Sequence, residues 1–353
     1  MSLQNLSMLP GGEAVREIDP QAPFYGMLQR SGLPLVENPY IVGGVVSVMW
    51  SEIEPANGVF NFEPLDQKIL PWARANKRVG IEVLSSSTPD LTIATPSIPG
   101  MKEIWGVNEE INEAIPQWLF GMGMRKVSSH TLGNVEPHEY WSPIYLSAYD
   151  RMVTELAKHY DGRDEVLYVN AAVGCDGRTQ LEDPPPKQFG HTGPSRGLLW
   201  RSIGYSESVW LETICTILSL YRSRFTRTPT VAQIVYPFIR QPEEIPGKGV
   251  VYVREDGSHE NPISELLSYA IAQGMWVEYD CHSTDIPPKE PEWHNSYLII
   301  NPRKSATMQG RPLMADLHRI LAMHPTFAII HGADIQNARN RSALEWAASG
   351  GVY

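Results

Sequence analysis

The feature that most constrains the fold is a regular alternation of short apolar runs with helical patterns along the whole chain. The runs are rich in β-branched residues and are bounded by glycine, proline or polar residues, which is typical of buried strands. Between them, apolar residues recur at helical spacing. We predict strands at 43–50, 78–84, 165–174, 230–238, 275–280, 296–301 and 327–332, a weaker strand at 13–18, and helices at 65–76, 147–160, 206–225, 263–274 and 314–324.

This order predicts parallel βα units, because each strand is followed by a helix that returns the chain to the same end of the sheet. Eight strands within 353 residues fit a closed barrel better than an open sheet. No G-x-G-x-x-G motif opens the first unit, so the dinucleotide-binding alternative lacks its fingerprint. We therefore expect residues 1–353 to form a single α/β domain, a (β/α)8 TIM barrel with long loops at its C-terminal mouth.

The charge balance narrows the class of partner. The formal net charge is −11, and no run of lysine or arginine stands out. Such a chain argues against binding to nucleic acid and to anionic membrane surfaces, and it is compatible with neutral ligands such as sugars. No window reaches about 18 consecutive apolar residues, so we expect no membrane-spanning segment.

The beginning of the chain and its cysteines leave the compartment and the oligomeric state open. The start, MSLQNLSMLPGG, has no basic region followed by an apolar one, so we expect no signal peptide. The protein is then either cytoplasmic or secreted with its signal removed. Cys175, Cys215 and Cys281 are too few and too widely spaced for a disulfide framework or a zinc knuckle, although a single disulfide is compatible with them.

Two long segments interrupt the alternation, at 88–143 and at 183–204. Both are rich in proline and glycine, and the first is also rich in tryptophan and methionine. Long loops in a compact domain are often functional. Because each segment follows a predicted strand, we place both at the C-terminal mouth of the barrel, where barrel enzymes keep their active sites.

The stretch WSEIEPANGVFNFEPLD, from Trp50 to Asp66, leaves the second predicted strand with a tryptophan, two close glutamates and a sharp turn. It resembles the segment after the second strand in (β/α)8 glycoside hydrolases of the β-galactosidase and cellulase kind, whose pattern is W-x-x-x-E-P-x-x-G-x-(Y/F)-(D/N)-F-x-x-(L/I)-D. The stretches RANKRVGIEVL, IPQWLF and YWSPIYLSAYDRMVTELAKHYDGRDEVLYVNAAVG follow in order. They resemble the family's third strand, its P-x-W-L motif, and its next helix and fourth strand. The resemblance covers residues 45–174 and implies a carbohydrate-acting barrel.

Much of this motif serves the turn itself. Pro55 and Gly58 reverse the chain at the barrel mouth, and Pro64 stands at a first-turn position of the following helix. We interpret Glu54 as a carboxylate that stabilises the turn. Trp50, at the strand end, either packs against its neighbours or stacks on the face of a sugar, and the sequence favours neither role.

The resemblance implies two catalytic glutamates, an acid/base at the end of the fourth strand and a nucleophile at the end of the seventh. Here the fourth strand is followed by Asp176, in phase with Asn170, and by Glu182, further into the loop. The seventh predicted strand has no carboxylate before Asp316, and Asn301 stands at its end. An amide can bind sugar hydroxyls, but it cannot attack carbon.

The sixth predicted strand carries further carboxylates. Burying charge is costly, so polar groups on a barrel strand need a purpose. We expect them to point into the barrel towards its mouth and at least one of them to contact substrate. The alternative is a buried carboxylate that pairs with an arginine such as Arg240. In the sequence GMWVEYDCHSTD, the residues that share this face are Trp276, Glu278, Asp280 and His282.

Other strands and loops supply further candidates. Glu82, on the third strand, is inward by the same alternation. Tryptophans in the loops, Trp118 among them, suit the apolar faces of pyranose rings. His331 and Asp334 follow the eighth strand. No residue spacing indicates a metal site, and a metal-assisted chemistry would have to draw on Asp280, His282, His331 and Asp334.

We therefore predict a glycoside hydrolase that acts on an oligo- or polysaccharide without cofactor or metal. Asp176 or Glu182 would be the general acid, and Glu278 or Asp280 the second carboxylate. One alternative is a carbohydrate-binding barrel without catalysis, which the missing seventh-strand glutamate favours. The other is a metal-assisted barrel enzyme of different chemistry. The predicted substrate-binding residues are Trp50, Glu82, Trp118, His282, Asn301 and His331.

Overall fold

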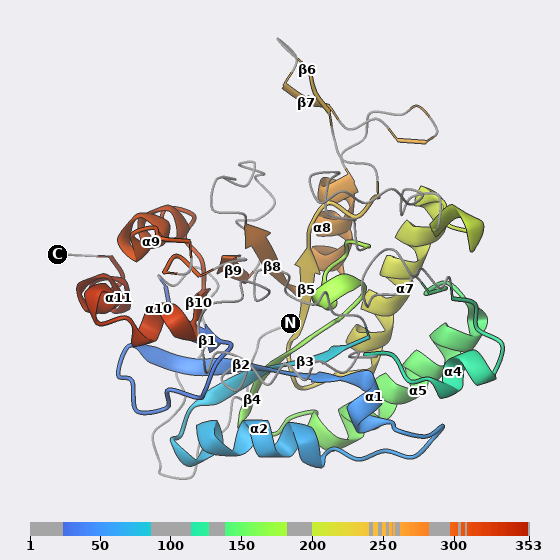
Figure 1. Cartoon of the computed structure of the whole chain (residues 1–353), viewed down its shortest axis with the longest axis horizontal. Coiled ribbons are helices and arrows are strands. Elements are labelled where there is room, and N and C mark those ends of the chain that lie inside the picture. Colours follow the sequence, from blue (N-terminus) through green and yellow to red (C-terminus); the bar gives the residue numbers. More distant parts are fainter. Residues whose placement is uncertain are drawn as a thin grey trace.

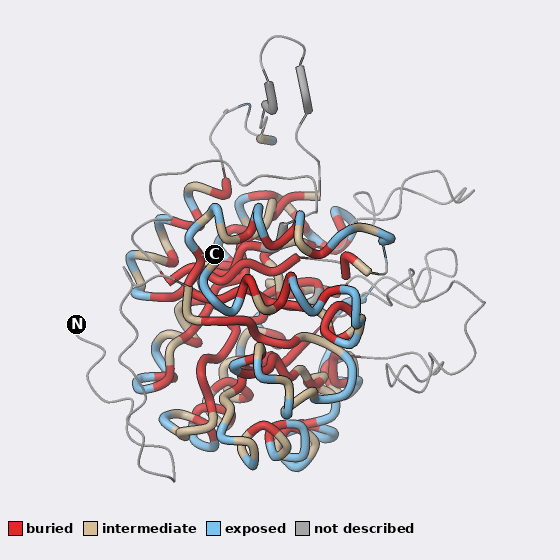
Figure 2. Tube along the Cα trace, turned by 90° about the vertical axis from the view of Figure 1, so that its left-hand side faces the viewer, coloured by how far each residue is buried: buried red, intermediate tan, exposed pale blue. Residues whose placement is uncertain are grey.

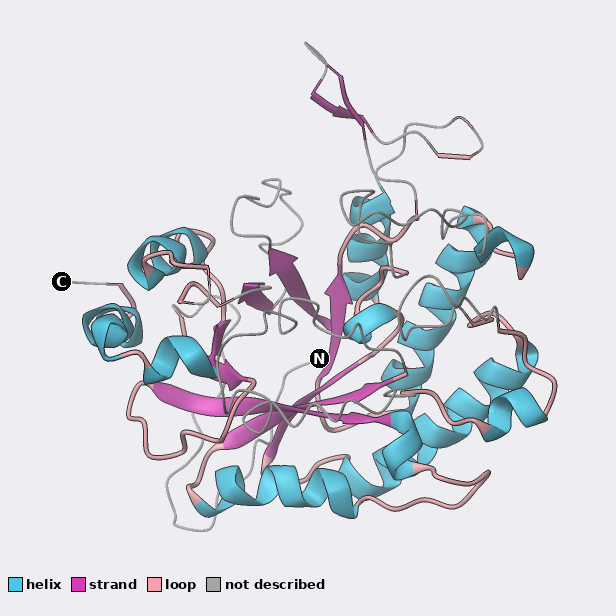
Figure 3. Cartoon of the chain, viewed as in Figure 1, coloured by secondary structure: helices cyan, strands magenta, loops and turns pink. Residues whose placement is uncertain are grey.

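Eight parallel strands close into a barrel, with helices around its outside (Figures 1 and 3). Around the ring the order is β1, β2, β3, β4, β5, β8, β9 and β10, and β10 pairs with β1 to close the barrel. The predicted (β/α)8 fold is confirmed. The computed structural model describes residues 24–85, 114–126, 138–181, 200–239, 243–245, 249–251, 254–255, 257, 262–281, 297–302, 305–307 and 309–351.

Seven of the barrel strands lie where the apolar runs predict them, and β1 does not. The strand expected at 13–18 lies outside the described residues. The five residues of β1, GMLQR, contain no β-branched side chain and end on two polar ones, so they lack the signature of a buried strand. The strands are β1 (Gly26–Arg30), β2 (Ile41–Met49), β3 (Arg78–Leu84), β4 (Val166–Asn170), β5 (Thr230–Ile234), β8 (Trp276–Cys281), β9 (Leu298–Pro302) and β10 (Phe327–His331).

The helices cover the outside of the barrel, and the short antiparallel pair β6 (Glu243–Ile245) and β7 (Gly249–Val251) lies beyond them (Figure 1). Among the described residues, no helix combines the length and apolar character needed to cross a bilayer. The helical segments are α1 (Trp50–Ile53), α2 (Glu63–Arg74), α4 (Trp118–Gly121), α5 (Pro143–Tyr160), η1 (Cys175–Gly177), α7 (Glu207–Arg224), α8 (Pro262–Ala272), α9 (Leu313–Leu321), α10 (Gly332–Gln336), η4 (Ala338–Asn340) and α11 (Arg341–Ala348).

The long helices begin at caps that the sequence encodes. Ser142 precedes α5, and its hydroxyl accepts a hydrogen bond from the backbone amide of Ile144. Ser206 precedes α7 and accepts one from Val209 in the same way. Each cap satisfies a backbone amide that has no partner inside the helix. The two helices then pack side by side, and α7 also contacts β5 (Figure 1).

Two apolar cores hold the barrel. The larger one lies between the strands and the surrounding helices, and Figure 2 shows buried and exposed residues alternating along the helices around buried strands. The smaller one fills the barrel interior below the C-terminal ends of the strands, so the barrel is a packed core and not a pore. This inner core consists of Leu28, Val45, Leu167, Tyr168, Val231, Trp276, Tyr297, Ile299, Phe327 and Ile329.

Tyr168 is the upper limit of the inner core, and a glycine makes room for it. Its ring is fully buried. A Cβ atom on Gly80, the neighbouring inward position on β3, would lie 2.2 Å from the ring carbon Cζ of Tyr168 and 2.5 Å from its hydroxyl oxygen. Residue 80 therefore has to be glycine while residue 168 is tyrosine.

We predict that Gly80→Ala lowers the free energy of unfolding by about 1–3 kcal/mol, the usual cost of forcing extra atoms into a packed core. Denaturant titration of the purified variants measures this loss. Gly121→Ala is the matched control, because a Cβ atom there meets nothing within 4 Å. In a Tyr168→Leu background the cost of Gly80→Ala should shrink, and an unchanged cost would mean that the clash is not with this ring.

Candidate active site

Above the inner core, towards the C-terminal ends of the strands, the inward-facing side chains become polar. Register brings them together: Ser47 on β2 lies beside Glu82 on β3, which lies beside Asn170 on β4. On the other side, Gln233 on β5 lies beside Glu278 on β8. We call this layer the polar floor, and it consists of Arg30, Ser47, Glu82, Asn170, Gln233, Glu278 and Asn301.

Arg30 joins the two glutamates of the polar floor. Its Nη2 atom lies 2.5 Å from Oε2 of Glu82, and its Nη1 atom lies 3.4 Å from Oε1 of Glu278. Both carboxylates are fully buried, whereas 19% of the Arg30 side chain is exposed. The expected inward positions of Glu82 and Glu278 agree with this arrangement, and the arginine that pairs with them is Arg30. Arg240, the partner suggested by the sequence, lies outside the described residues.

Uncharged groups also donate hydrogen bonds to both carboxylates. Oε2 of Glu82 accepts from the hydroxyl of Ser47 at 2.8 Å, and its Oε1 accepts from the amide of Asn170 at 3.2 Å. Oε1 of Glu278 accepts from the amide of Asn301 at 2.7 Å. Such hydrogen bonds to the ionised form are what a buried carboxylate needs. Asn301 therefore stands in the floor, bonded to a candidate carboxylate.

Tyr168 lies directly beneath the two glutamates. Burial raises the pKa of its phenol well above the ordinary value, the negative charges of Glu278 and Glu82 raise it further, and Arg30 lowers it in part. The phenol therefore stays protonated throughout the pH range in which proteins work. It can donate a hydrogen bond, but it cannot act as a base.

The chain after β4 folds over the mouth of the barrel. The strand ends at Asn170 and not at 174 as predicted, because the backbone turns back: the amides of Val173 and Gly174 bond to the carbonyls of Gly177 and Arg178. A Cβ atom on Gly177 would lie 3.6 Å from the amide oxygen of Gln233. Asp176 in η1 thus has its backbone over the β3–β5 side of the polar floor, and its side chain is outside the described part.

Trp50 faces away from the polar floor. It is fully buried and packs edge-on against Tyr145 and Tyr149 of α5. Its ring nitrogen donates to Oε2 of Glu54 at 2.7 Å, and Oε1 of Glu54 accepts from the backbone of Gly58 and from Arg151, both at 2.9 Å. Glu54 therefore stabilises the turn, as interpreted from the sequence. Because the ring of Trp50 packs against α5 on the outside of the barrel, it does not face the polar floor.

The loop tryptophans that are described pack against other aromatic rings. Trp118 is partly buried, donates to the carbonyl of Glu54 at 3.1 Å and lies edge-on to Trp50. Trp200 stacks with Tyr140, and Trp141 lies against Trp200. They form an aromatic layer outside the barrel between α4, α5 and α7. Trp118 retains some exposed surface near the mouth.

The polar residues at the end of β10 and just after it make hydrogen bonds to neighbouring segments of the chain. Nε2 of His331 lies 2.7 Å from the carbonyl oxygen of Pro302, and Nδ1 lies 3.4 Å from the hydroxyl of Ser31. Asp334 is buried and accepts from Ser305 and from the backbone amide of Thr307. Within the described ranges, no group of three or more histidine, cysteine, aspartate or glutamate side chains could hold a metal ion.

Three further candidates have side chains outside the described part of the chain. Glu182 and His282 lie beyond the described residues, and for Asp280 only the backbone is described, in register with Asn301. Neither Cys175 nor Cys215 is in a disulfide. Asp280 lies within β8, whereas Glu182 and His282 follow β4 and β8 in the sequence.

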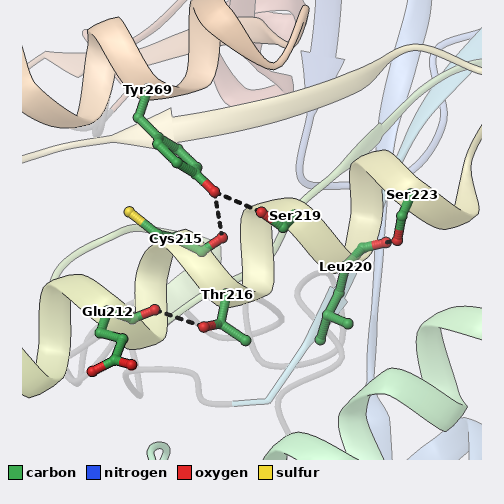
Figure 4. A pocket seen from close by; sticks show the side chains of 7 residues that line it. All are labelled: Glu212, Cys215, Thr216, Ser219, Leu220, Ser223 and Tyr269. Carbon is green, nitrogen blue, oxygen red and sulfur yellow. Dashed lines mark hydrogen bonds between the residues drawn. The ribbon is translucent and has the colours of Figure 1, made fainter.

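A groove of about 420 Å³ between α7 and α8 is a separate feature on the outside of the barrel (Figure 4). Its hydroxyls are already engaged: Tyr269 lies 2.6 Å from Ser219, and Thr216 donates to the carbonyl of Glu212. Burial raises the pKa of the Cys215 thiol to about 11, so this thiol is protonated and unreactive. The groove has no set of convergent reactive groups.

Comparison with known proteins finds a family match over part of the chain. Residues 41–176, from β2 to η1, match the family model described as beta-galactosidase. The chain is a (β/α)8 barrel, and this segment of it resembles the glycoside hydrolases. This match contains the turn at Trp50, together with Glu82 and Asp176, and it confirms the resemblance predicted from the sequence. It ends before β8, so the glycoside hydrolase signature does not reach Glu278.

A solved structure supports the barrel fold over most of the chain. The catalytic domain of beta-amylase from Paenibacillus polymyxa superposes with a TM-score of 0.61 at 9% identity, over 93% of this chain and 99% of that chain. A GH10 xylanase from Bispora sp. MEY-1, crystallised with xylobiose, gives a TM-score of 0.46 at 10% identity, over 86% of this chain and 82% of that one. No curated protein matches the chain by sequence.

Several members of the polar floor were not predicted as site residues. Arg30 was missed because β1 itself was missed. Ser47 and Gln233 are uncharged, but strand alternation identifies them as inward, since Val45 and Val231 two residues earlier belong to the inner core. The same alternation places Trp50 outward, in phase with Val46 and Val48 of the outer core.

We predict that Glu54→Gln destabilises the protein by about 1–3 kcal/mol, because an amide cannot replace both oxygens as acceptors and buried donors lose their partner. Denaturant titration measures the loss. Glu52→Gln, in the same turn, is the control: Glu52 is exposed, and within the described residues its side chain accepts from the amide of Met49, which a glutamine oxygen can also do. Equal losses in the two variants would contradict the structural role of Glu54.

Proposed function

We propose that this protein hydrolyses a glycosidic bond of an oligo- or polysaccharide at the C-terminal mouth of its barrel. The observation that carries the proposal is the polar floor, with two fully buried carboxylates bound to one guanidinium. Burying these charges costs free energy that an apolar layer would avoid. Barrel enzymes place their chemistry at this end, and the family match supports carbohydrate as the substrate.

In this proposal Glu278 is the second carboxylate, and Asp176 or Glu182 is the general acid. The acid protonates the leaving oxygen, while the ionised carboxylate attacks the anomeric carbon or activates a water molecule. We choose Glu278 over Glu82 because Glu82 is held by three donors from β1, β2 and β4, which suits an anchor better than a reacting group. Asp280 is the alternative for the second carboxylate.

The sugar at the floor is expected to be uncharged. Arg30, the guanidinium of the polar floor, is already engaged by Glu82 and Glu278, so the three groups together carry one net negative charge. A uronate or sulfated sugar would meet this negative charge and be repelled by it. A neutral pyranose can instead use hydrogen bonds to the exposed part of Arg30 and to the amides.

A carbohydrate-binding barrel without catalysis is the second candidate. The observation that favours it is Asn301 at the end of β9, where the family resemblance implies a nucleophilic glutamate. The amide of Asn301 donates to Glu278, and an amide cannot attack carbon. Binding would then survive neutralisation of each carboxylate, whereas hydrolysis would not.

The test is chromophore release from aryl α- and β-glycosides, together with reducing-end release from neutral polysaccharides. Wild type is compared with Asp176→Asn, Glu182→Gln, Glu278→Gln and Glu82→Gln. We expect Glu278→Gln and one of the two acid variants to lower kcat by about 10²-fold or more, as loss of acid–base catalysis does. The exposed Glu212 on α7 gives the control, Glu212→Gln, which should leave turnover unchanged.

Binding is measured in parallel as the shift of melting temperature with each sugar. If no substrate is cleaved while a sugar raises the melting temperature of wild type and of Glu278→Gln alike, the binding barrel is the correct function. If cleavage persists in all four carboxylate variants, these residues are not the catalytic pair.

A further inference from the structure

We propose that Arg30 is a positioning residue for catalysis, which holds Glu278 ionised and in one orientation while Glu82 anchors the guanidinium. This inference rests on the proposed hydrolase function and assigns a role to a residue outside the segment matched by the family model. Arg30 does not have to contact the reacting atoms for this role. It acts through the carboxylate that does.

The topology makes Arg30 a bridge across the barrel interior. In the closed ring β1 is separated from β3 by one strand, β2, and from β8 by two strands, β9 and β10. Neither glutamate is a neighbour of Arg30 in the sheet, so the contacts run across the lumen and not along a strand pair. A long side chain at the end of β1 therefore connects two parts of the barrel wall that the backbone hydrogen bonds do not connect.

The two ends of this bridge differ. Glu82 is bound at 2.5 Å and has two further donors, Ser47 and Asn170, so its hydrogen bonding is complete. Glu278 is bound at 3.4 Å and receives Arg30 and Asn301 on the same oxygen, Oε1. The tight end fixes the guanidinium, and the looser end fixes the rotation of the Glu278 carboxylate. This asymmetry identifies Glu82 as the anchor and Glu278 as the group that is held.

The charges around Glu278 show why the guanidinium matters. From β3 it faces Glu82, a second negative charge, and from β4 the protonated phenol of Tyr168. From β9 it receives the neutral amide of Asn301, and His331 of β10 lies next to Arg30 in the strand register. Arg30 is thus the cation of the described floor. Two carboxylates that share one site favour protonation of one of them, and a guanidinium between them opposes it.

The consequence is a defined pH dependence. In the proposed reaction Glu278 works ionised, so activity falls on the acid side as Glu278 becomes protonated. Without Arg30, repulsion from Glu82 favours the protonated form, and the acid limb of the kcat profile moves to higher pH. A residue that only stabilises the fold would leave this limb in place.

The experiment compares the pH profiles of kcat and KM in Arg30→Gln, Arg30→Lys and wild type, on the glycoside that wild type cleaves. For Arg30→Gln we expect the acid limb to move up by about 1–3 pH units, the range that one close charge supplies. We also expect kcat at its optimum to fall by about 10-fold or more with KM nearly unchanged. Arg30→Lys keeps the charge and should return the limb towards wild type. Arg341→Gln, at an exposed arginine that pairs with Glu345, is the control.

Removal of the guanidinium leaves two buried carboxylates together, so Arg30→Gln can fail to fold. The second variant is therefore Arg30→Gln with Glu82→Gln, which removes one charge of each sign and leaves the net charge of the floor unchanged. Because Glu278 then loses the guanidinium and keeps the hydrogen bond from Asn301, we expect the same loss of kcat. An acid limb and a kcat equal to those of wild type in this variant would overturn the inference.

A readout independent of turnover separates this inference from the proposed function. The melting-temperature shifts of Arg30→Lys and Glu278→Gln should not add up in the variant that combines these two substitutions, because each substitution disturbs the same contact. Additive shifts would overturn the proposed contact between Arg30 and Glu278 even in an active enzyme. If wild type cleaves no substrate, the catalytic role falls together with the proposed function, whereas non-additive shifts would still establish the contact.

Discussion

The interior of the barrel depends on one arrangement of charge: a guanidinium from β1 between carboxylates from β3 and β8. Two ionised carboxylates this deeply buried would repel each other strongly without a cation and hydrogen-bond donors. The neighbouring strands supply those donors in register, with Ser47 and Asn170 on either side of Glu82. The layer below is arranged to match, because Gly80 leaves the space that the ring of Tyr168 fills. The charged polar floor and the packed inner core are therefore in direct contact inside the barrel.

Most of the fold could be predicted from the sequence because parallel strands buried on both faces are continuous apolar runs. Seven of the barrel strands could be predicted from such runs. β1 did not, since its last two residues are Gln29 and Arg30, and its place is fixed by pairing with β10 and β2 about three hundred and about fifteen residues away in the chain. Local patterns carry no record of such pairing. The end of β4 was also missed, because the turn after Asn170 is set by backbone hydrogen bonds to Gly177 and Arg178.

The candidate site, too, could be predicted only in part from the sequence. Strand alternation was enough to place Glu82 and Glu278 inside the barrel, since each lies two residues from an inner position. It also places Trp50 outside, in phase with Val46 and Val48, so the sugar-stacking role considered for this ring did not follow from the strand pattern. What alternation could not provide was the partner. The arginine that binds Glu278 is 248 residues away in the sequence, and only closure of the barrel brings them together.

The absence of a carboxylate at the end of β9 takes on a different meaning in this setting. Asn301 donates to the very oxygen of Glu278 that also receives Arg30, so the seventh strand still acts on a carboxylate, although that carboxylate belongs to the sixth. In the proposed mechanism the reacting group has moved by one strand around the ring, and the amide left behind orients it. The general acid then has to come from the segment after β4, where η1 already lies over the β3–β5 side of the floor. A barrel of this kind can keep two carboxylates across one mouth while departing from the family's usual positions for both.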